Sequence, residues 1–236
     1  MRYVFADCRW SLGDPEWGRA RYLAGHVPGA VFLDVERALS GPPGPGGRHP
    51  LPAAADFAAA MRAAGVGADT FVVAYGTMGG AERLWWLLRH FGHDRCAVID
   101  LDGWRGPLAA GEEPPPEPGS FAPCPRSDDA IDRDELAARL GELVVVDARR
   151  PERWRGEPNP LDRVPGRIPG AVNAPWDEPL PDLPAGELVA YCGSGITACV
   201  TLHRLALAGR SGRLYPGSWS EWEQDERLPR ERGPGL

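Results

Sequence analysis

The residues most able to do chemistry lie in one short stretch, Cys-Gly-Ser-Gly-Ile-Thr-Ala, at positions 192–198. An apolar run over residues 188–191 precedes it with the pattern of a buried strand, and residues 197–208 have the pattern of a helix. Backbone N–H groups at a helix N-terminus, with the positive end of the helix dipole, favour an anion. Such a setting lowers the pKa of a cysteine from its ordinary value of about 8.5. We therefore expect Cys192 to be a nucleophile that carries negative charge.

A buried structural cysteine at the end of a strand is the alternative interpretation, because cysteine is among the residues most often buried. For a cysteine alone this interpretation would be preferred. The two glycines that follow Cys192, and the helix that begins directly after them, favour the reactive cysteine instead.

The composition argues against several other classes of function. The chain has 236 residues, of which 43% are hydrophobic and 25% charged, as in ordinary globular proteins. A net charge of −7 without a basic run argues against a general nucleic-acid binder. No apolar stretch is long enough to span a bilayer, and residues 1–7 reach polar side chains too early for a signal peptide.

The cysteines predict a reducing environment. There are five, at positions 8, 96, 124, 192 and 199, an odd number without paired spacing. That usage fits the cytoplasm better than a disulfide scaffold. No CxxC pair and no His/Cys cluster has the spacing of a zinc site. We expect a cytoplasmic protein that needs neither a metal nor another cofactor.

Four motifs occur twice in the same order, which indicates a duplicated unit. The pairs are residues 4–9 and 144–149, 25–31 and 166–172, 72–76 and 188–192, and 102–104 and 216–219. Each unit alternates short apolar strands with helical segments, which predicts an α/β fold with a mainly parallel central sheet flanked by helices. The first unit has Gly76 where the second has Cys192. Glycine cannot act as a nucleophile, so we expect a single active site.

The elements that must position the cysteine follow from the same pattern. Apolar spacing and first-turn acidic residues predict helices over residues 53–64, 81–91 and 131–140. A proline-rich stretch between the units is typical of a linker, because proline fixes φ and removes a backbone donor. We therefore divide the chain into residues 1–110, a linker over 111–127, and a catalytic domain over 128–236.

The motifs resemble the signatures of the rhodanese family. Residues 22–30 are similar to its N-terminal signature, residues 217–222 to its C-terminal signature, and residues 192–198 to its active-site loop. The resemblance covers nearly the whole chain and implies two rhodanese-like domains, an inert first one and a catalytic second one. In that family the cysteine takes a sulfur atom from a donor and stands as a persulfide. It then passes the sulfur to a thiophilic acceptor such as cyanide, a thiol or thioredoxin.

Two other uses of this fold are weaker interpretations. A cysteine phosphatase needs an arginine that closes the loop and binds phosphate through two hydrogen bonds. Position 198 is alanine, and no arginine lies between Cys192 and Arg204. A non-catalytic sulfur carrier or docking module is the other possibility, and the intact Cys192 loop argues against pure docking.

The loop sequence separates two kinds of sulfur donor. Thiosulfate enzymes of the family typically have basic residues just after the cysteine, whereas the loop here is similar to that of 3-mercaptopyruvate sulfurtransferases. The resemblance implies that Ser194 works with a histidine of the first domain, here His49, and with an acidic residue. Glu36 aligns best with that acid, which is more usually aspartate. We expect 3-mercaptopyruvate as the donor, with thiosulfate:cyanide sulfurtransferase activity as the alternative.

Both donors are anions, so cationic residues must meet them. The resemblance implies a substrate arginine for which Arg153 is the nearest match, and a second one for which Arg163 is the nearest candidate. Arg149 is a third candidate, and the planar guanidinium suits a carboxylate or sulfonate. The donor-binding positions of the loop are Gly193, Gly195, Ile196 and Thr197. The expected partners are a small anionic donor and a thiol, cyanide or thioredoxin-like acceptor, without nucleic acid or membrane.

Overall fold

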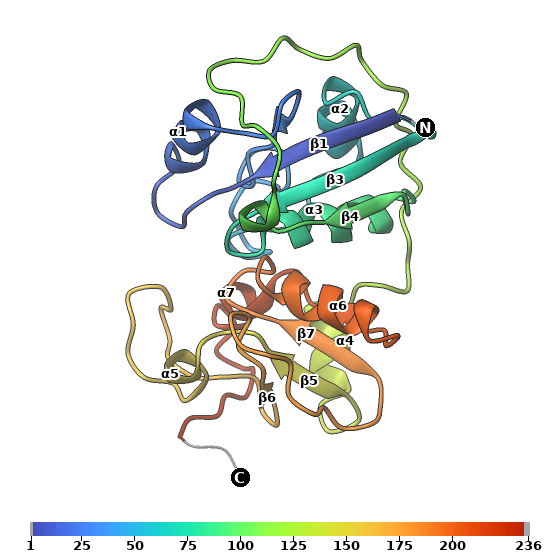
Figure 1. Cartoon of the computed structure of the whole chain (residues 1–236). Helices are drawn as coiled ribbons and strands as arrows, with labels where there is room; N and C mark the ends of the chain where they lie inside the picture. The colour runs from blue at the N-terminus through green and yellow to red at the C-terminus, as the bar shows by residue number, and fades with distance from the viewer. Residues whose placement is uncertain (1, 234–236) are drawn as a thin grey trace. The chain divides into compact units, whose positions relative to one another are not determined.

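The computed structural model describes residues 2–233, which form two compact units (Figure 1). Within residues 2–233, unit 1 comprises residues 2–41 and 51–126, and unit 2 comprises residues 42–50 and 127–233. The segment 42–50 therefore belongs to unit 2, although the sequence-based division assigns it to the first domain. That division, at residues 110 and 127, stays a prediction.

Unit 1 is built on a four-stranded parallel sheet in the order β2-β1-β3-β4. Its strands are β1 (Arg2–Cys8), β2 (Val31–Phe32), β3 (Thr70–Gly76) and β4 (Cys96–Val98). Its helices are α1 (Trp17–Ala24), α2 (Ala54–Ala63), α3 (Gly80–His90) and the 3₁₀ turn η1 (Leu101–Gly103). In Figure 1, α2 and α3 lie on either side of the β1–β3 pair.

Unit 2 repeats this topology, with a parallel sheet in the order β6-β5-β7-β8. Its strands are β5 (Val144–Asp147), β6 (Val172–Asn173), β7 (Leu188–Tyr191) and β8 (Arg213–Leu214). Its helices are α4 (Arg133–Ala138), α5 (Pro151–Trp154), α6 (Ala198–Leu207) and α7 (Ser218–Trp222). The predicted fold class is confirmed, and every strand pair in both sheets of the described chain is parallel.

The predicted helices are found with small differences at their ends. The helix expected over 131–140 is the shorter α4, because the Asp132 side chain caps it by accepting from the Glu135 N–H at 2.8 Å. Gly141, with φ of +88°, follows its other end, and a positive φ ends a helix. The remaining predictions, over 53–64, 81–91 and 197–208, match α2, α3 and α6 to within about two residues.

The Asp-x-Arg motif of unit 1 has a structural task. Arg9 donates to both oxygens of Asp7 and, at 2.6 Å, to the carbonyl oxygen of Gly25. The hydroxyl of Tyr75 accepts from the Val27 N–H at 3.2 Å. These bonds hold the Gly-x-x-Pro-Gly turn against the carboxyl ends of β1 and β3.

Unit 2 makes the same bonds around its own turn. Arg149 donates to both oxygens of Asp147 and, at 2.8 Å, to the carbonyl oxygen of Gly166. The hydroxyl of Tyr191 accepts from the Ile168 N–H at 3.1 Å and donates to Asp147 Oδ2 at 2.6 Å. The duplication therefore extends to the hydrogen bonds, and Arg149 is the structural counterpart of Arg9.

The core of unit 2 lies directly under the cysteine loop. Trp219 and Trp222 of α7 are fully buried and pack with Tyr191 of β7 and with Tyr215. Large buried aromatic side chains dominate the free energy of such a core. Helix α7 is thus anchored beneath the end of β7, where it can support the loop.

No helix within residues 2–233 is long and apolar enough to cross a bilayer.

Candidate functional site

Cys192 follows β7 directly, at the carboxyl end of the sheet, and is 2% exposed. Helix α7 holds this position through three hydrogen bonds. The Cys192 N–H donates to Ser218 Oγ at 3.1 Å, the Trp219 N–H donates to the Cys192 carbonyl at 3.0 Å, and the Ser220 N–H donates to the Gly193 carbonyl at 3.0 Å. The C-terminal signature of the sequence therefore fixes the backbone of the loop.

A tight turn then leads from the cysteine into α6. Gly195 has φ of +81°, which disfavours any other residue. A Cβ at Gly195 would also lie 2.4 Å from the Pro216 carbonyl oxygen. The turn ends where α6 begins at Ala198, so the loop N–H groups point back toward the cysteine sulfur.

The loop lowers the pKa of the Cys192 thiol. Cys192 Sγ accepts from the Gly195 N–H at 3.1 Å and from the Ser194 N–H at 3.5 Å. Burial by itself raises the pKa, but a hydrogen bond from the Thr197 hydroxyl and N–H bonds from Ser194, Ala198 and Gly195 outweigh it. The loop therefore stabilises the thiolate form of a sulfur that is nearly shielded from water.

Ser194 and His49 are brought together. His49 Nδ1 lies 2.7 Å from Ser194 Oγ, in a hydrogen bond between two buried side chains 145 residues apart in sequence. A hydroxyl can donate and accept at once, and a neutral imidazole has one nitrogen of each kind. The pair can therefore hold or pass a proton beside the sulfur loop.

Glycines allow segment 42–50 to reach this position. Gly44 and Gly47 exchange N–H···O bonds of 3.0 Å, which closes the segment into a tight turn. Gly47 has φ of +98°, and a Cβ there would lie 2.7 Å from both the Gly217 carbonyl oxygen and Ser220 Oγ. The Arg48 N–H then donates to Ser220 Oγ at 3.0 Å. The same helix, α7, thus supports both the cysteine loop and the histidine segment.

Arg153 sits on the short helix α5 and is held by a buried carboxylate. Its Nε and Nη2 donate to the two oxygens of Asp162 at 2.9 and 2.5 Å. The Asp162 carboxylate also accepts from Asn159 at 2.9 Å and lies 3.4 Å from Arg149 Nη1. Burial raises the Asp162 pKa, but bonds from Arg153 and the charge of Arg149 lower it below its usual range. Asp162 therefore stays charged and fixes the orientation of Arg153.

The other two candidate arginines lie elsewhere. The Arg149 side chain is fully buried, bonded to Asp147, and its guanidinium lies 4.8 Å above the Trp219 ring. Arg163 is exposed and has no hydrogen bond or ion pair with another residue in the range 2–233. Of the three arginines, Arg153 approaches the loop, and the geometry of Arg149 favours a supporting role. Donor binding by Arg149 and Arg163 stays a prediction.

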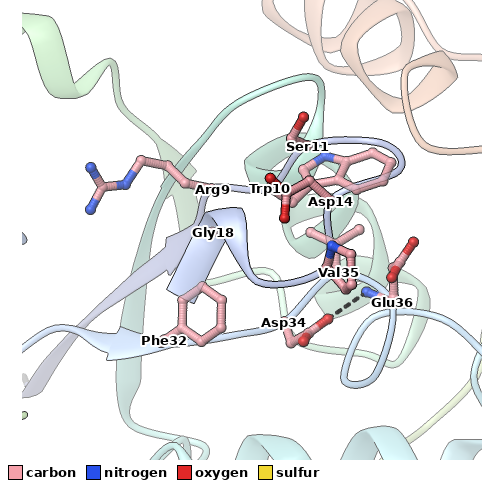
Figure 2. Close-up of a pocket in the computed structure, with 10 residues that line it drawn as sticks. Arg9, Trp10, Ser11, Asp14, Gly18, Phe32, Asp34, Val35 and Glu36 are labelled. Carbon is pink, nitrogen blue, oxygen red and sulfur yellow. Dashed lines mark hydrogen bonds between the residues drawn. The ribbon is translucent and has the colours of Figure 1, made fainter. Parts of the chain in front are cut away.

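Glu36 lies in unit 1, in the segment after β2, and is exposed. Its N–H donates to Asp34 Oδ1 at 2.9 Å, the bond drawn in Figure 2. It lines a pocket of unit 1 together with Arg9, Trp10 and Asp14, and Arg9 and Glu36 stand at opposite ends of the view. Its part in a proton relay stays a prediction.

Three further residues of unit 2 belong to the surroundings of the cysteine and were missed in the sequence. They are Arg48, Asp162 and Ala198, whose N–H helps to lower the Cys192 pKa. Arg48 directly precedes His49, and that adjacency is the signal that could have found it. Asp162 directly precedes Arg163, so the sequence spacing pointed to within one residue of Asp162 but to an arginine instead of a carboxylate.

Among residues 2–233, no group of three or more His, Cys, Asp or Glu side chains could hold a metal ion. The expectation that the protein needs no metal or other cofactor stays a prediction.

The geometry places a cysteine of lowered pKa at the carboxyl end of a parallel α/β sheet. Comparison with known proteins gives the family. A model of the rhodanese-like domain matches residues 2–106 and again residues 132–225, so the chain belongs to the rhodanese-like family and contains two copies of its domain.

Several relatives are similar along nearly their whole length. A protein of Pseudomonas aeruginosa named "Probable 3-mercaptopyruvate sulfurtransferase" is 43% identical, over 94% of this chain and 90% of its own. The 3-mercaptopyruvate sulfurtransferase of Escherichia coli is 37% identical, over 89% and 84% of the two chains. A Mycobacterium tuberculosis protein with the provisional name thiosulfate sulfurtransferase SseB is 38% identical, over 96% and 90%.

The solved structures agree with this grouping. The crystal structure of SseA from Escherichia coli, described as a 3-mercaptopyruvate sulfotransferase, has a TM-score of 0.77 and 32% identity, covering 93% of each chain. The 3-mercaptopyruvate sulfurtransferase of Leishmania major has a TM-score of 0.80 and 28% identity, covering 94% of this chain and 70% of its own. The curated relatives are enzymes that transfer sulfur, and this chain has the fold of that class.

Proposed function

We propose that the protein is a sulfurtransferase that takes sulfur from 3-mercaptopyruvate onto Cys192 and passes it to a thiol acceptor. The hydrogen bond between His49 and Ser194 is the observation that favours 3-mercaptopyruvate as the donor, because it places a proton-handling pair beside the cysteine loop. The names of the relatives from Pseudomonas aeruginosa and Escherichia coli support the same donor.

The first step forms a persulfide. The Cys192 thiolate attacks the thiol sulfur of 3-mercaptopyruvate, a bond forms between the two sulfur atoms, and the carbon–sulfur bond of the donor breaks. Its electron pair stays on carbon, which leaves the enolate of pyruvate. Ser194, backed by His49, supplies the proton that converts the enolate to pyruvate. The loop N–H groups that lower the Cys192 pKa hold the negative charge before the attack.

The second step transfers the sulfur and regenerates the Cys192 thiolate. An acceptor thiolate attacks the outer sulfur of the persulfide, the sulfur–sulfur bond of the enzyme breaks, and Cys192 becomes a thiolate again. A small thiol, cyanide or a thioredoxin-like protein can serve as acceptor in this chemistry. The step needs no metal or cofactor.

The remaining residues position the donor. Arg153, oriented by Asp162, meets the donor's anionic group, and Arg149 supports Asp162 from behind. Gly193, Gly195, Ile196 and Thr197 form the floor of the site, and Arg163 and Glu36 are the further candidates for donor binding and for the relay. Nucleic acid and membrane have no part in this function. We place the protein in the cytoplasm, and fractionation of cells that make it, with detection by antibody, checks that location.

The test is sulfur transfer measured with 3-mercaptopyruvate and with thiosulfate on the purified protein. Cys192→Ser should abolish transfer, and Cys124→Ser, the same change at an exposed cysteine, should leave it intact. His49→Ala should lower 3-mercaptopyruvate turnover far more than thiosulfate turnover, because sulfite leaves without a proton. Equal losses with both donors would refute the proton-transfer role.

Thiosulfate:cyanide sulfurtransferase activity is the second candidate, favoured by the name of the Mycobacterium tuberculosis relative. A strong preference for thiosulfate in the same assay would select it and keep the Cys192 persulfide. Wild-type protein without activity on either donor would favour a sulfur carrier or docking module.

A further inference from the structure

Arg48 and Arg153 converge on one point beside the residue that follows the cysteine. The point is where a Cβ would stand on Gly193. Arg153 Nη2 lies 2.8 Å from it, Arg48 Nη2 lies 3.1 Å from it, and Arg153 Nη1 lies 3.2 Å from it. Three guanidinium nitrogens from two side chains thus face the side of Gly193 that a side chain would otherwise cover.

The two arginines differ in how their charge is balanced. Arg153 forms a two-bond ion pair with Asp162, through Nε and Nη2. Arg48 donates from Nη1 to the Leu161 carbonyl at 2.7 Å and has no ion pair with a carboxylate among residues 2–233. Its Nε is buried and has no hydrogen-bond partner within the same part of the chain. Arg48 is therefore a half-buried cation without a direct ion pair in the described part of the chain.

The electrostatic environment of Arg48 agrees with this description. Burial lowers the Arg48 pKa most, and the like charge of Arg153 lowers it further. Asp162, Cys192 and Glu223 oppose these effects and do not cancel them. An anion bound between the two guanidinium groups would relieve both costs, since it supplies charge and hydrogen bonds together.

We propose that Arg48 and Arg153 together bind the oxyanion of the sulfur donor over the side of Gly193 that carries no side chain. Arg48 thereby takes the place that sequence spacing suggested for Arg163. The inference rests on the proposed sulfurtransferase function and identifies the second cation of its donor site. The ligand chemistry is a carboxylate or a sulfonate next to a transferable sulfur.

One consequence concerns the order of residues in segment 42–50. Arg48, which binds the donor's charge, directly precedes His49, which hydrogen-bonds Ser194. Both are placed by the same contact of the Arg48 N–H with Ser220 Oγ. The donor's oxyanion and the proton that its enolate needs are therefore handled by neighbouring residues of one turn.

The alternative is that Arg48 only fastens segment 42–50 to the Leu161 carbonyl. The two roles give different kinetics. Loss of a fastening residue displaces His49 and lowers kcat, whereas loss of a donor-binding cation weakens donor binding and raises KM. Lysine at position 48 keeps the charge and loses the planar fork, so it should restore donor binding in part.

The test compares Arg48→Gln, Arg48→Lys and the matched control Arg155→Gln, which removes the same charge from a half-exposed residue paired with Glu157. Steady-state kinetics with 3-mercaptopyruvate, and separately with thiosulfate, give KM and kcat. Binding of pyruvate, followed by tryptophan fluorescence, gives a dissociation constant that does not depend on turnover. Loss of a charged hydrogen-bond partner typically weakens binding about ten- to hundredfold.

We expect Arg48→Gln to raise KM and the pyruvate dissociation constant within that range, with kcat nearly unchanged. Arg155→Gln should match the wild type, and a rise in KM with thiosulfate as well would show that the site accepts a sulfonate. The proposal would be overturned if Arg48→Gln left KM unchanged or lowered kcat alone. It would also be overturned if Arg163→Gln, and not Arg48→Gln, gave this rise in KM. Inactive wild type, or active Cys192→Ser, would instead refute the proposed function.

A second variant keeps the test decisive if Arg48→Gln folds poorly. Gly193 does not have a positive φ, so alanine is compatible with its backbone. Its added methyl would cover the side of Gly193 that the two guanidinium groups face, 2.8 Å from Arg153 Nη2. Gly193→Ala should therefore raise KM for 3-mercaptopyruvate, because the methyl covers this side of the loop and displaces the Arg153 guanidinium while both arginines keep their charge. Unchanged KM in a folded Gly193→Ala protein would also overturn the proposal.

Discussion

Thr197 is the residue through which the reactivity of Cys192 can be changed with the least disturbance. Its hydroxyl makes the side-chain hydrogen bond that contributes most to lowering the Cys192 pKa. Thr197→Val keeps the branched shape of the side chain and removes the hydroxyl. We expect the Cys192 pKa to rise, because burial, which raises it, then loses the largest of the hydrogen bonds that oppose it.

The size of the effect follows from two opposing quantities. A hydrogen bond to a charged group contributes about 1.5–3 kcal/mol, so the thiolate fraction at a pH below the pKa should fall about ten- to hundredfold. A more basic thiolate is also a better nucleophile, with a Brønsted coefficient of about 0.4–0.5, which recovers about half of that loss on a logarithmic scale. The rate of alkylation near neutral pH should therefore fall about three- to tenfold.

The two effects predict a crossing of the pH profiles. At low pH the variant should react more slowly than the wild type, because less thiolate is present. At a pH above both pKa values the variant should react faster by a similar factor, because its thiolate is more basic. A change in access to the buried sulfur would lower the rate equally at every pH, so a crossing separates the two explanations.

The assay is the rate of iodoacetamide alkylation between pH 5 and 10, with Cys192 followed by peptide mass spectrometry. A Cys124→Ser background removes the exposed cysteine that would react in parallel. Thr201→Val is the matched control, since Thr201 is a buried threonine one turn further along α6. Parallel profiles for Thr197→Val and wild type, or an equal shift in Thr201→Val, would refute this account of the thiolate.

Three further predictions concern the support of the site. Gly47→Ala places a side chain at a positive φ and against the Gly217 carbonyl, which should lower the unfolding free energy by about 1–3 kcal/mol. The kcat with 3-mercaptopyruvate should fall strongly as well, and an unchanged kcat would contradict this prediction. Tyr191→Phe removes a buried hydroxyl with two partners and should lower both thermal stability and kcat, whereas Tyr75→Phe should lower thermal stability alone. The midpoint of thermal unfolding and steady-state kinetics test both variants. The lowered folded-state pKa of Cys192 means that its thiolate stabilises the fold above the unfolded-state pKa, and that this stability is lost as pH falls through the folded-state pKa. The unfolding free energy of Cys192→Ser, measured by chemical denaturation, should lack that part of the wild-type pH dependence.

Features carried by local residue types were predictable from the sequence. The apolar runs that end in Asp-x-Arg or in Cys192 predicted parallel strands, because their repetition limits the possible topologies. The glycines of the cysteine loop predicted an anion-holding turn. Gly76, at the equivalent position of the first repeat, predicted that only one copy has a nucleophile.

The supporting charges were not predictable in the same way. Residues 149–163 contain several arginines, and spacing alone does not show which side chain turns inward. Whether Arg153 points to the loop depends on the carboxylate of Asp162. The position of the Arg48 side chain depends on where a glycine-rich segment without periodicity packs. The supporting geometry of Arg149 had a usable signal, because its repeat counterpart Arg9 lies in the unit with Gly76 at the cysteine position.

The composition of unit 2 has a consequence for how the protein is made. The hydrogen bonds of His49 with Ser194 and of Arg48 with Ser220 join residues 145 and 172 positions apart. Contacts of such long range form late, because the entropy of closing the intervening chain must be overcome first. During synthesis, segment 42–50 leaves the ribosome long before α7, its binding surface, exists. Both sheets can therefore be in place before the enzyme is competent, and recovery of activity during refolding should lag behind recovery of secondary structure.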